Sequence, residues 1–119
     1  MPYYNAGKHV MLNALGAVVT HLAAHTGFPA TALNEVTGGS PVYARQVAAW
    51  ATAGATVQGS MSLSNTPAFN IPAGTTVASI GGWSALTAGT LYADADVVDE
   101  VYANQGTYTI TAGALNLNA

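Results

Sequence analysis

Hydrophobic positions follow a helical period only near the start of the chain. Between Ala6 and Val19, apolar residues recur every three or four positions, a spacing that gathers them on one face of an α-helix. Asn5 stands just before this run, and asparagine is a favoured N-cap residue. The pattern predicts one helix over about residues 6–18, with Gly16 near its end. The recurring apolar positions are Val10, Met11 or Leu12, Leu15 and Val18.

From Val18 onwards the pattern is typical of β-strands, with short runs of β-branched and aromatic residues between glycine and proline turns. The clearest alternation covers Thr56–Ser64, where Met61 and Leu63 share one face with Val57 and the serines share the other. Pro72-Ala73-Gly74 predicts a type II turn, because glycine accepts the positive φ needed there. We expect strands over Val18–Thr26, Val42–Ala51, Thr56–Ser64, Thr75–Trp83, Leu91–Val98, Thr107–Thr111 and Ala114–Asn118.

Several short strands at roughly 8–12-residue spacing favour a sandwich over alternating strands and helices. The predicted fold is mainly β: an antiparallel β-sandwich or jelly-roll-like domain with one N-terminal α-helix. The chain has 119 residues, which suits a single domain over 1–119, with the helix at 6–18 and the β-rich part at 18–118. The expected core comprises Val57, Met61, Leu63, Phe69, Ile71, Val77, Ile80, Tyr108 and Ile110.

Charged residues make up 6% of the chain, against about 25% in ordinary soluble domains. Its surface must therefore be mostly small and neutral, which loses little on burial against another protein and suits a subunit of a large assembly. We expect the isolated protein to self-associate through neutral, apolar surface, nearly independently of salt, because there are few ion pairs to screen. A trimer or a higher symmetric ring is the expected arrangement.

The same composition excludes several classes of partner. Two basic residues and a net charge of −3 argue against nucleic-acid binding, which needs several Lys or Arg on one face. No window reaches the roughly 18–20 continuous apolar residues of a membrane span. The first residues lack the basic and apolar regions of a secretory signal, and the absence of cysteine rules out disulfides and thiolate metal sites.

Histidines and acids supply two weak candidate metal sites. His21 and His25 would share one face of a strand, but no carboxylate is near them in sequence, so we interpret them as structural. Four of the five acids fall within residues 94–100, without the loop spacing of a calcium site. We interpret this segment as a solvated acidic loop or an electrostatic contact with a partner. Its acids are Asp94, Asp96, Asp99 and Glu100.

No enzyme motif is present. Ser40, His25 and Glu35 supply the residue types of a hydrolase triad, but there is no Gly-x-Ser-x-Gly elbow around the serine. Gly38-Gly39-Ser40 lacks the lysine that follows in a phosphate-binding loop. The sequence predicts a protein without catalytic residues, metal or cofactor.

Glu35 and Arg45 are the only acid and base around the Thr37–Pro41 turn. We expect them to form an ion pair that closes this long loop, contributing about 1 kcal/mol if half exposed. Alternatively, Arg45 reaches a neighbouring subunit, where its planar fork binds carboxylate or carbonyl oxygens. Tyr43, Trp50 and Trp83 join these two as candidate structural or interface residues, since large aromatics dominate both cores and interfaces.

Several segments, in the same order and over nearly the whole chain, resemble small tail-fibre-like or decoration-like virion structural proteins of tailed actinobacterial phages. This resemblance implies a virion structural role, in a particle assembled in the host cytoplasm, and no catalytic residues. The segments that carry it are Ala6–Lys8, Met11–Leu15, His25–Pro29, Asn34–Gln46, Ile71–Val77, Gly106–Thr111 and Leu115–Leu117.

Within that role, the absence of a shaft repeat slightly favours capsid decoration or a minor capsid position over a tail-fibre or minor tail position. The expected partners are copies of the chain and other virion proteins, either major capsid or tail proteins. A glycan-binding module of a tail fibre is the alternative, because aromatic side chains can stack on sugars. The aromatic residues considered are Tyr3, Tyr4, Tyr43, Trp50, Trp83, Tyr92, Tyr102 and Tyr108.

Overall fold

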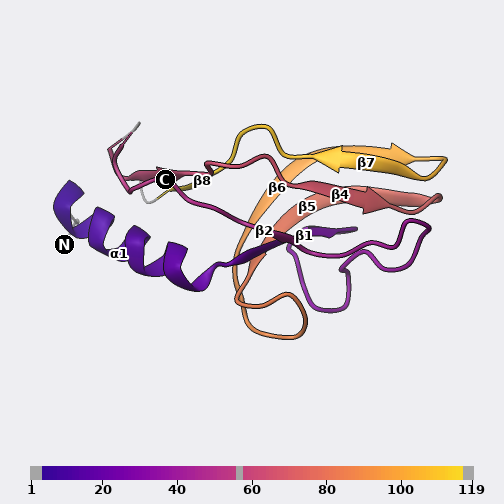
Figure 1. Ribbon diagram of the computed structural model, residues 1–119, viewed down its shortest axis with the longest axis horizontal. Helices are drawn as coiled ribbons and strands as arrows, with labels where there is room; N and C mark the ends of the chain where they lie inside the picture. The colour runs from indigo at the N-terminus through magenta and orange to yellow at the C-terminus, as the bar shows by residue number, and fades with distance from the viewer. Residues whose placement is uncertain (1–3, 56–57, 117–119) are drawn as a thin grey trace.

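The computed structural model describes residues 4–55 and 58–116, and within them the chain is mainly β with one N-terminal helix (Figure 1). The predicted fold class, an antiparallel β-sandwich with an N-terminal helix, is confirmed. In the described part of the chain, no helix is long and apolar enough to cross a membrane. The elements are α1 (Asn5–Val18), β1 (His21–His25), β2 (Gln46–Val47), β3 (Ser60–Ser62), β4 (Ala68–Ile71), β5 (Thr75–Trp83), β6 (Leu91–Tyr102), β7 (Gly106–Thr109) and β8 (Ala114–Asn116).

Two antiparallel layers make up the body. One is a four-stranded sheet in the order β2-β1-β5-β6. The other is a ribbon in which β3 pairs with β8 and β4 pairs with β7. Backbone hydrogen bonds from Leu63 N to Gly113 O (2.8 Å) and from Ile110 N to Pro67 O (2.9 Å) link the two pairs into one long, slightly irregular ribbon.

The main core lies between the sheet and the ribbon. Phe69 and Ile71 from β4 and Val77 from β5 are fully buried, as the sequence predicted, and Ile80 is 9% exposed. Leu63, Tyr108 and Ile110 pack against this core from its margin. Met61 belongs to a second, smaller cluster under the helix, and Val57 lies outside the described residues.

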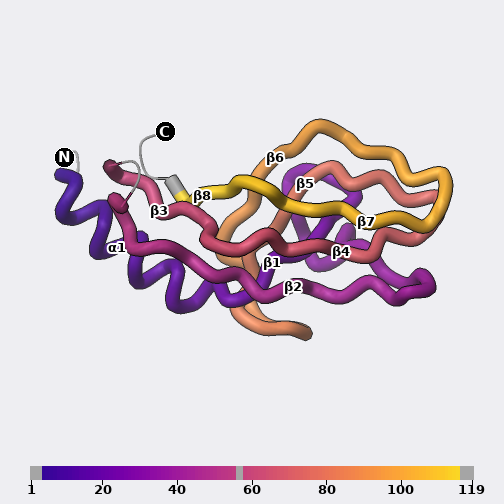
Figure 2. The backbone as a smooth tube through the Cα atoms, turned by 45° about the horizontal axis from the view of Figure 1, so that its top comes forward, coloured from indigo at the N-terminus to yellow at the C-terminus, as the bar shows by residue number. Residues whose placement is uncertain are grey.

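The two layers are joined along one side and open along the other. On the joined side, Trp50 bridges to Leu63, and Ala51 N donates to Ser62 O at 2.9 Å. On the opposite side, no backbone hydrogen bond within the described residues joins β6 to β7 or β8. Figure 2 shows β6 and the β7–β8 side of the ribbon running as separate edges. We call this open side the seam.

Helix α1 extends from one end of an elongated body measuring 46 × 24 × 23 Å (Figure 1). Its one fully buried residue among those described is Leu12, which packs with Ala53 and Met61. Two prediction details are wrong: Tyr4, not Asn5, occupies the N-cap position, and Val10 is 70% exposed.

The helix turns Val10 outwards because polar side chains take part in its packed face. Asn13 Oδ1 accepts from Ala53 N at 3.1 Å, and His9 Nε2 accepts from Gly59 N at 2.9 Å. These bonds satisfy loop backbone groups that the folded chain would otherwise leave unpaired. The angular position of the helix is therefore set by hydrogen bonds as well as by Leu12, and Val18 is also 39% exposed.

Two predicted strands shrink in the structure. Of Thr56–Ser64 only β3 is strand, because Gly59 turns the chain with φ +74° and hydrogen-bonds to the helix; residues 56 and 57 are not described. Of Val42–Ala51 only β2 is strand, because Ala49 N leaves the ladder to donate to Asn65 Oδ1.

The other strand predictions agree more closely. β5 matches its predicted range, β1 lies inside Val18–Thr26, and β6 continues past Val98 to Tyr102. Gly74 has the positive φ expected of the turn before β5, at +76°. Its N–H donates to Tyr102 O at 2.7 Å, so the turn is fixed to the end of β6.

Candidate functional site

The predicted Glu35–Arg45 ion pair forms, and it is more buried than expected. Arg45 Nη2 and Nε donate to the two Glu35 carboxylate oxygens at 2.8 and 2.9 Å, a bidentate arrangement. The side chains are only 7% and 15% exposed. The pair bridges the long loop that precedes β2.

Arg45 also holds the loop between β5 and β6. Its Nη1 donates to Ala85 O at 2.9 Å and to Ala88 O at 2.7 Å, and its guanidinium carbon lies 4.0 Å from the centre of the Trp83 ring. The carbonyl contacts that were considered for a neighbouring subunit are thus made within the chain. One arginine orders two loops that are far apart in sequence.

Tyr43 and His25 extend these contacts into a buried polar network. The Tyr43 hydroxyl donates to Glu35 Oε2 at 2.9 Å and accepts from Ala24 N at 3.0 Å. Fully buried His25 accepts from Trp83 Nε1 at 3.2 Å through Nε2, which leaves Nδ1–H to donate to an oxygen 2.8 Å away. That oxygen is Oδ1 of Asn34, a residue that the sequence did not single out.

Charge effects in the network favour ionised Glu35. Burial alone would raise the pKa of its carboxyl, but hydrogen bonds from Arg45 and Tyr43, with the positive charge of Arg45, outweigh burial and hold this pKa below its usual value. Burial, and then the Glu35 charge, raise the pKa of Tyr43 far above its usual range. The phenol therefore keeps the proton that it donates to Glu35.

The lowered pKa of Glu35 predicts a loss of stability in acid. A carboxyl whose folded pKa lies below its unfolded value of about 4.3 stabilises the fold above that pH. This contribution disappears as the pH falls through the lower, folded pKa. At pH values below about 4, we expect the free energy of unfolding, measured by urea titration, to decrease as the pH is lowered. In Glu35→Gln this decrease should be smaller, because the variant has no carboxyl to protonate at that position. Asp96→Asn, at an exposed acid, should show the same decrease as the wild type. A decrease of the same size in Glu35→Gln would contradict the assignment to Glu35.

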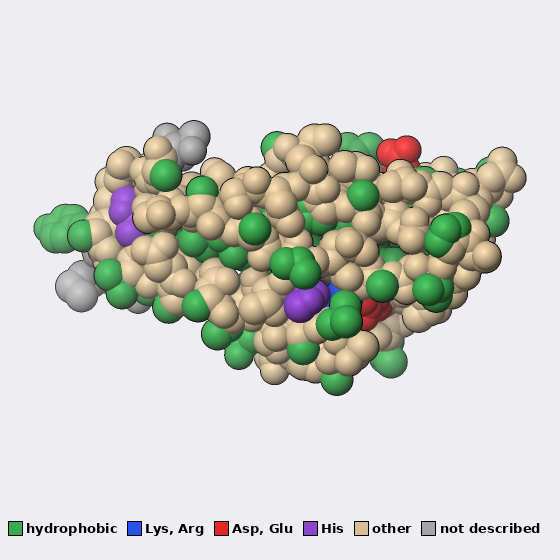
Figure 3. Space-filling model, viewed as in Figure 1, with side chains coloured by type: hydrophobic (Ala, Val, Ile, Leu, Met, Phe, Trp, Pro, Cys, Tyr) green, Lys and Arg blue, Asp and Glu red, His purple; other side chains and the backbone are tan. Residues whose placement is uncertain are grey.

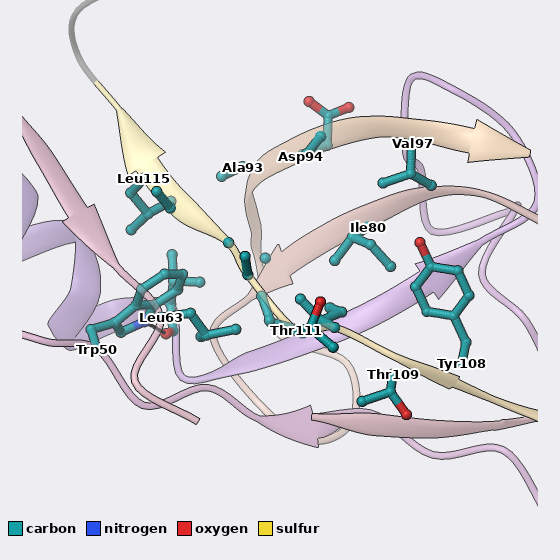
Figure 4. A pocket seen from close by; sticks show the side chains of 18 residues that line it. Trp50, Leu63, Ile80, Ala93, Asp94, Val97, Tyr108, Thr109, Thr111 and Leu115 are labelled. Carbon is teal, nitrogen blue, oxygen red and sulfur yellow. Dashed lines mark hydrogen bonds between the residues drawn. The ribbon is translucent and has the colours of Figure 1, made fainter. Parts of the chain in front are cut away.

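An apolar hollow lies in the seam. It has a volume of about 260 Å³ and opens between the inner face of β6 and the edge of the ribbon. Figure 4 shows Val97, Ile80, Tyr108, Leu63 and Leu115 around it, with Trp50 at one end. We call this hollow the seam groove. Trp50, a predicted interface candidate, lies here and not in the Arg45 network.

The acidic residues lie on strand β6, beside the seam groove, which corrects the interpretation as a loop. In its central part, Val77 pairs with Glu100 and Ser79 with Asp96, so β6 bulges where residues 97–99 face Ala78. Asp94 points away from the groove in Figure 4, and its Oδ2 accepts from Ala30 N at 3.0 Å. The described residues contain no group of three or more His, Cys, Asp or Glu that could hold a metal.

Other candidate chemistry does not assemble. His25 and Glu35 are bridge partners on adjacent segments, but the partners of the His25 ring are Asn34 and Trp83, and Ser40 N instead meets the Gln105 side chain. Among the aromatic residues, Trp83 is 4% exposed and Tyr43 is in the network. The well-exposed tyrosines, Tyr4 (87%) and Tyr92 (50%), lie at the helix start and on β6, and no sugar-stacking platform is seen in the described part of the chain.

The remaining surface is largely neutral, as Figure 3 shows on one face. Leu33 is 98% exposed and has no charged neighbour in the sequence. Val98 is 91% exposed and has one, Asp99. Single exposed apolar side chains are common on protein surfaces, so the sparse charge is the unusual feature of this surface.

Comparison with known protein families gives a match over most of the chain. A family model described as podophage GP4 fiber I protein gp80 matches residues 12–118, from the middle of α1 through the last described strand. No curated protein and no solved structure gives a significant match. The match agrees with the resemblance to phage fibre-type proteins and gives no support to the preference for capsid decoration.

Proposed function

The chain belongs to the family of the podophage GP4 fiber I protein gp80, and from this premise we propose that it is a non-enzymatic module of a phage tail fibre. Membership makes it a fibre-type structural protein and a component of the virion. The single observation that carries the proposal is the family match over residues 12–118, nearly the whole chain.

Neutral surface supports the assembly side of this proposal. Of the seven charged side chains, Glu35 and Arg45 are used inside the fold and four acids are confined to β6. Most of the remaining surface can meet a copy of the chain or another virion protein without desolvating charge, which is the costly part of burying a surface. The proposed partners are therefore further copies and other tail proteins, joined by apolar and backbone contacts.

Particle composition tests this function. In purified particles of the phage that encodes the chain, quantitative mass spectrometry should find far fewer copies of it than of the major capsid protein. Immunogold labelling should place it on the tail, with an antibody to the major capsid protein as the control for the head. Copy numbers close to those of the capsid protein, or labelling spread over the head, would instead establish a decoration role.

A further inference from the structure

We propose that the seam binds an extended segment of a different virion protein, with apolar side chains in the seam groove and Lys or Arg beside the acids of β6. The inference rests on the proposed function and adds the chemistry of one partner. Three features of the described residues carry it: two free strand edges, an apolar hollow between them, and four exposed acids on β6.

Free backbone edges border the seam on both sides. Within residues 4–55 and 58–116, β6 is an outer strand of the sheet that pairs only with β5, while β7 pairs only with β4 and β8 only with β3. Unpaired strand edges present rows of N–H and C=O groups that an added strand can bind. An extended segment lying in the seam would pair with these groups and close the side on which the sandwich is open.

The seam groove suits the apolar side chains of such a segment. Val97 and Ile80 line it from the sheet, and Leu63, Tyr108 and Leu115 line it from the ribbon. Alternate residues of an added strand would point into this hollow. Burial, followed by the Glu100 charge, raises the pKa of Tyr108, so its hydroxyl stays protonated and can donate to a docked carbonyl.

The charge on β6 selects the partner. Asp94, Asp96, Asp99 and Glu100 are exposed on this one strand. Asp94 already accepts a hydrogen bond from Ala30 N, and the charge of Glu100 acts on Tyr108 of the groove. A strand added at this edge would therefore have carboxylates beside it. Opposite charges on neighbouring strands stabilise the pairing, and like charges oppose it. A segment with outward Lys or Arg therefore fits, while the β6 strand of a second copy is repelled.

This chain does not supply the basic segment itself. It has two basic residues, of which Arg45 is buried in its own ion pair and Lys8 is in the helix. An extended piece of a second copy would bring at most one basic residue to four acids. The complementary strand must come from another protein, and the acids also protect the long free edge of β6 from pairing with copies of the chain.

Peptide titration of the whole protein tests the proposal. The probe is a synthetic peptide in which Lys and Val alternate, and ¹H–¹⁵N NMR follows the backbone and both indole N–H signals. Trp50 lines the seam groove, whereas Trp83 lies in the Arg45 network and serves as an internal control. We expect saturable shifts at Trp50, β6 and the ribbon edge, with Trp83 unchanged, and weaker binding in high salt.

Two kinds of variant separate the apolar and charged parts. Ala95→Phe should abolish peptide binding by filling the groove from an exposed position of β6, and Ala103→Phe, at the exposed turn after β6, should leave it intact. Removing two exposed acids in Asp96→Asn with Glu100→Gln should weaken binding roughly tenfold and reduce its salt dependence. These two acids lie outside the core, so this variant reports on binding even if the groove variant fails to fold.

Three results would overturn the proposal: no saturable shifts in the seam, equal binding of a peptide with Glu in place of Lys, or self-association of the free chain that Ala95→Phe abolishes. The last result would assign the groove to a second copy. Failure here leaves the fibre function standing if the protein is found on the tail, while absence from the tail removes the fibre function whatever the peptide does.

Discussion

Replacing Arg45 by alanine is expected to lower the free energy of unfolding by about 3–5 kcal/mol, because it leaves the Glu35 carboxylate buried without its partner. The substitution also removes the donors for Ala85 O and Ala88 O and the guanidinium that stacks on Trp83. Domains of this size are stable by about 5–15 kcal/mol, so the loss is a large part of the total. Urea unfolding followed by tryptophan fluorescence gives the number.

Two further variants show whether the cost comes from the unpaired charge. Glu35→Gln combined with Arg45→Met should cost less than Arg45→Ala alone, because neither buried charge remains. Arg45→Lys keeps the charge but loses the bidentate geometry, so it should fall between wild type and Arg45→Ala. A loss of less than about 1 kcal/mol in Arg45→Ala would show that the pair behaves like an ordinary surface ion pair.

The Glu35–Arg45 pair could be predicted from the sequence because few charged residues could form it. With one acid and one base around the long loop, their meeting followed from elimination. The depth of burial did not follow, because it depends on Tyr43, Trp83 and the 84–90 loop, which come together only through the order of the strands. His25 and Asn34 were missed as network members for the same reason: their partners lie across the fold.

Strand prediction succeeded where pattern and backbone agreed. Thr75–Trp83 is a largely buried strand inside the sheet, and its β-branched residues are typical of such a strand. Thr56–Ser64 had the clearest alternation, yet most of its described residues are not strand. Gly59 adopts positive φ and its N–H meets His9 of the helix, a contact between distant residues that no local pattern contains.

The seam groove could not be predicted from the sequence, because it arises from strands that do not pair. Periodicity identifies which residues of β6 and β7 face inwards, but not that these strands remain apart. The cluster of acids at residues 94–100 is visible in the sequence, but the sequence does not show where it lies in the fold. The structure places these acids on an outer strand, where their charge opposes pairing of the free β6 edge with the same edge of another copy.

The second large effect is expected at Phe69, the largest fully buried side chain among the described residues. Its ring packs on Tyr43, with ring centres 6.2 Å apart, and it belongs to the core cluster that contains Val77 and Ile80 of the sheet. Phe69→Ala removes the apolar contacts between the two layers and leaves a cavity, so it should cost about 3–5 kcal/mol of unfolding free energy.

The chain supplies a matched control, since its other phenylalanine, Phe28, is 53% exposed. Phe28→Ala should change the free energy of unfolding by no more than about 0.5 kcal/mol. Phe69→Leu, which keeps most of the volume, should cost clearly less than Phe69→Ala, because a cavity costs more the larger it is. Equal losses in the two alanine variants, measured by urea unfolding, would mean that the sheet and the ribbon are not held together by this core. A large loss at Phe69 alone would instead show that the two layers are joined through their core even though one side of the sandwich is open.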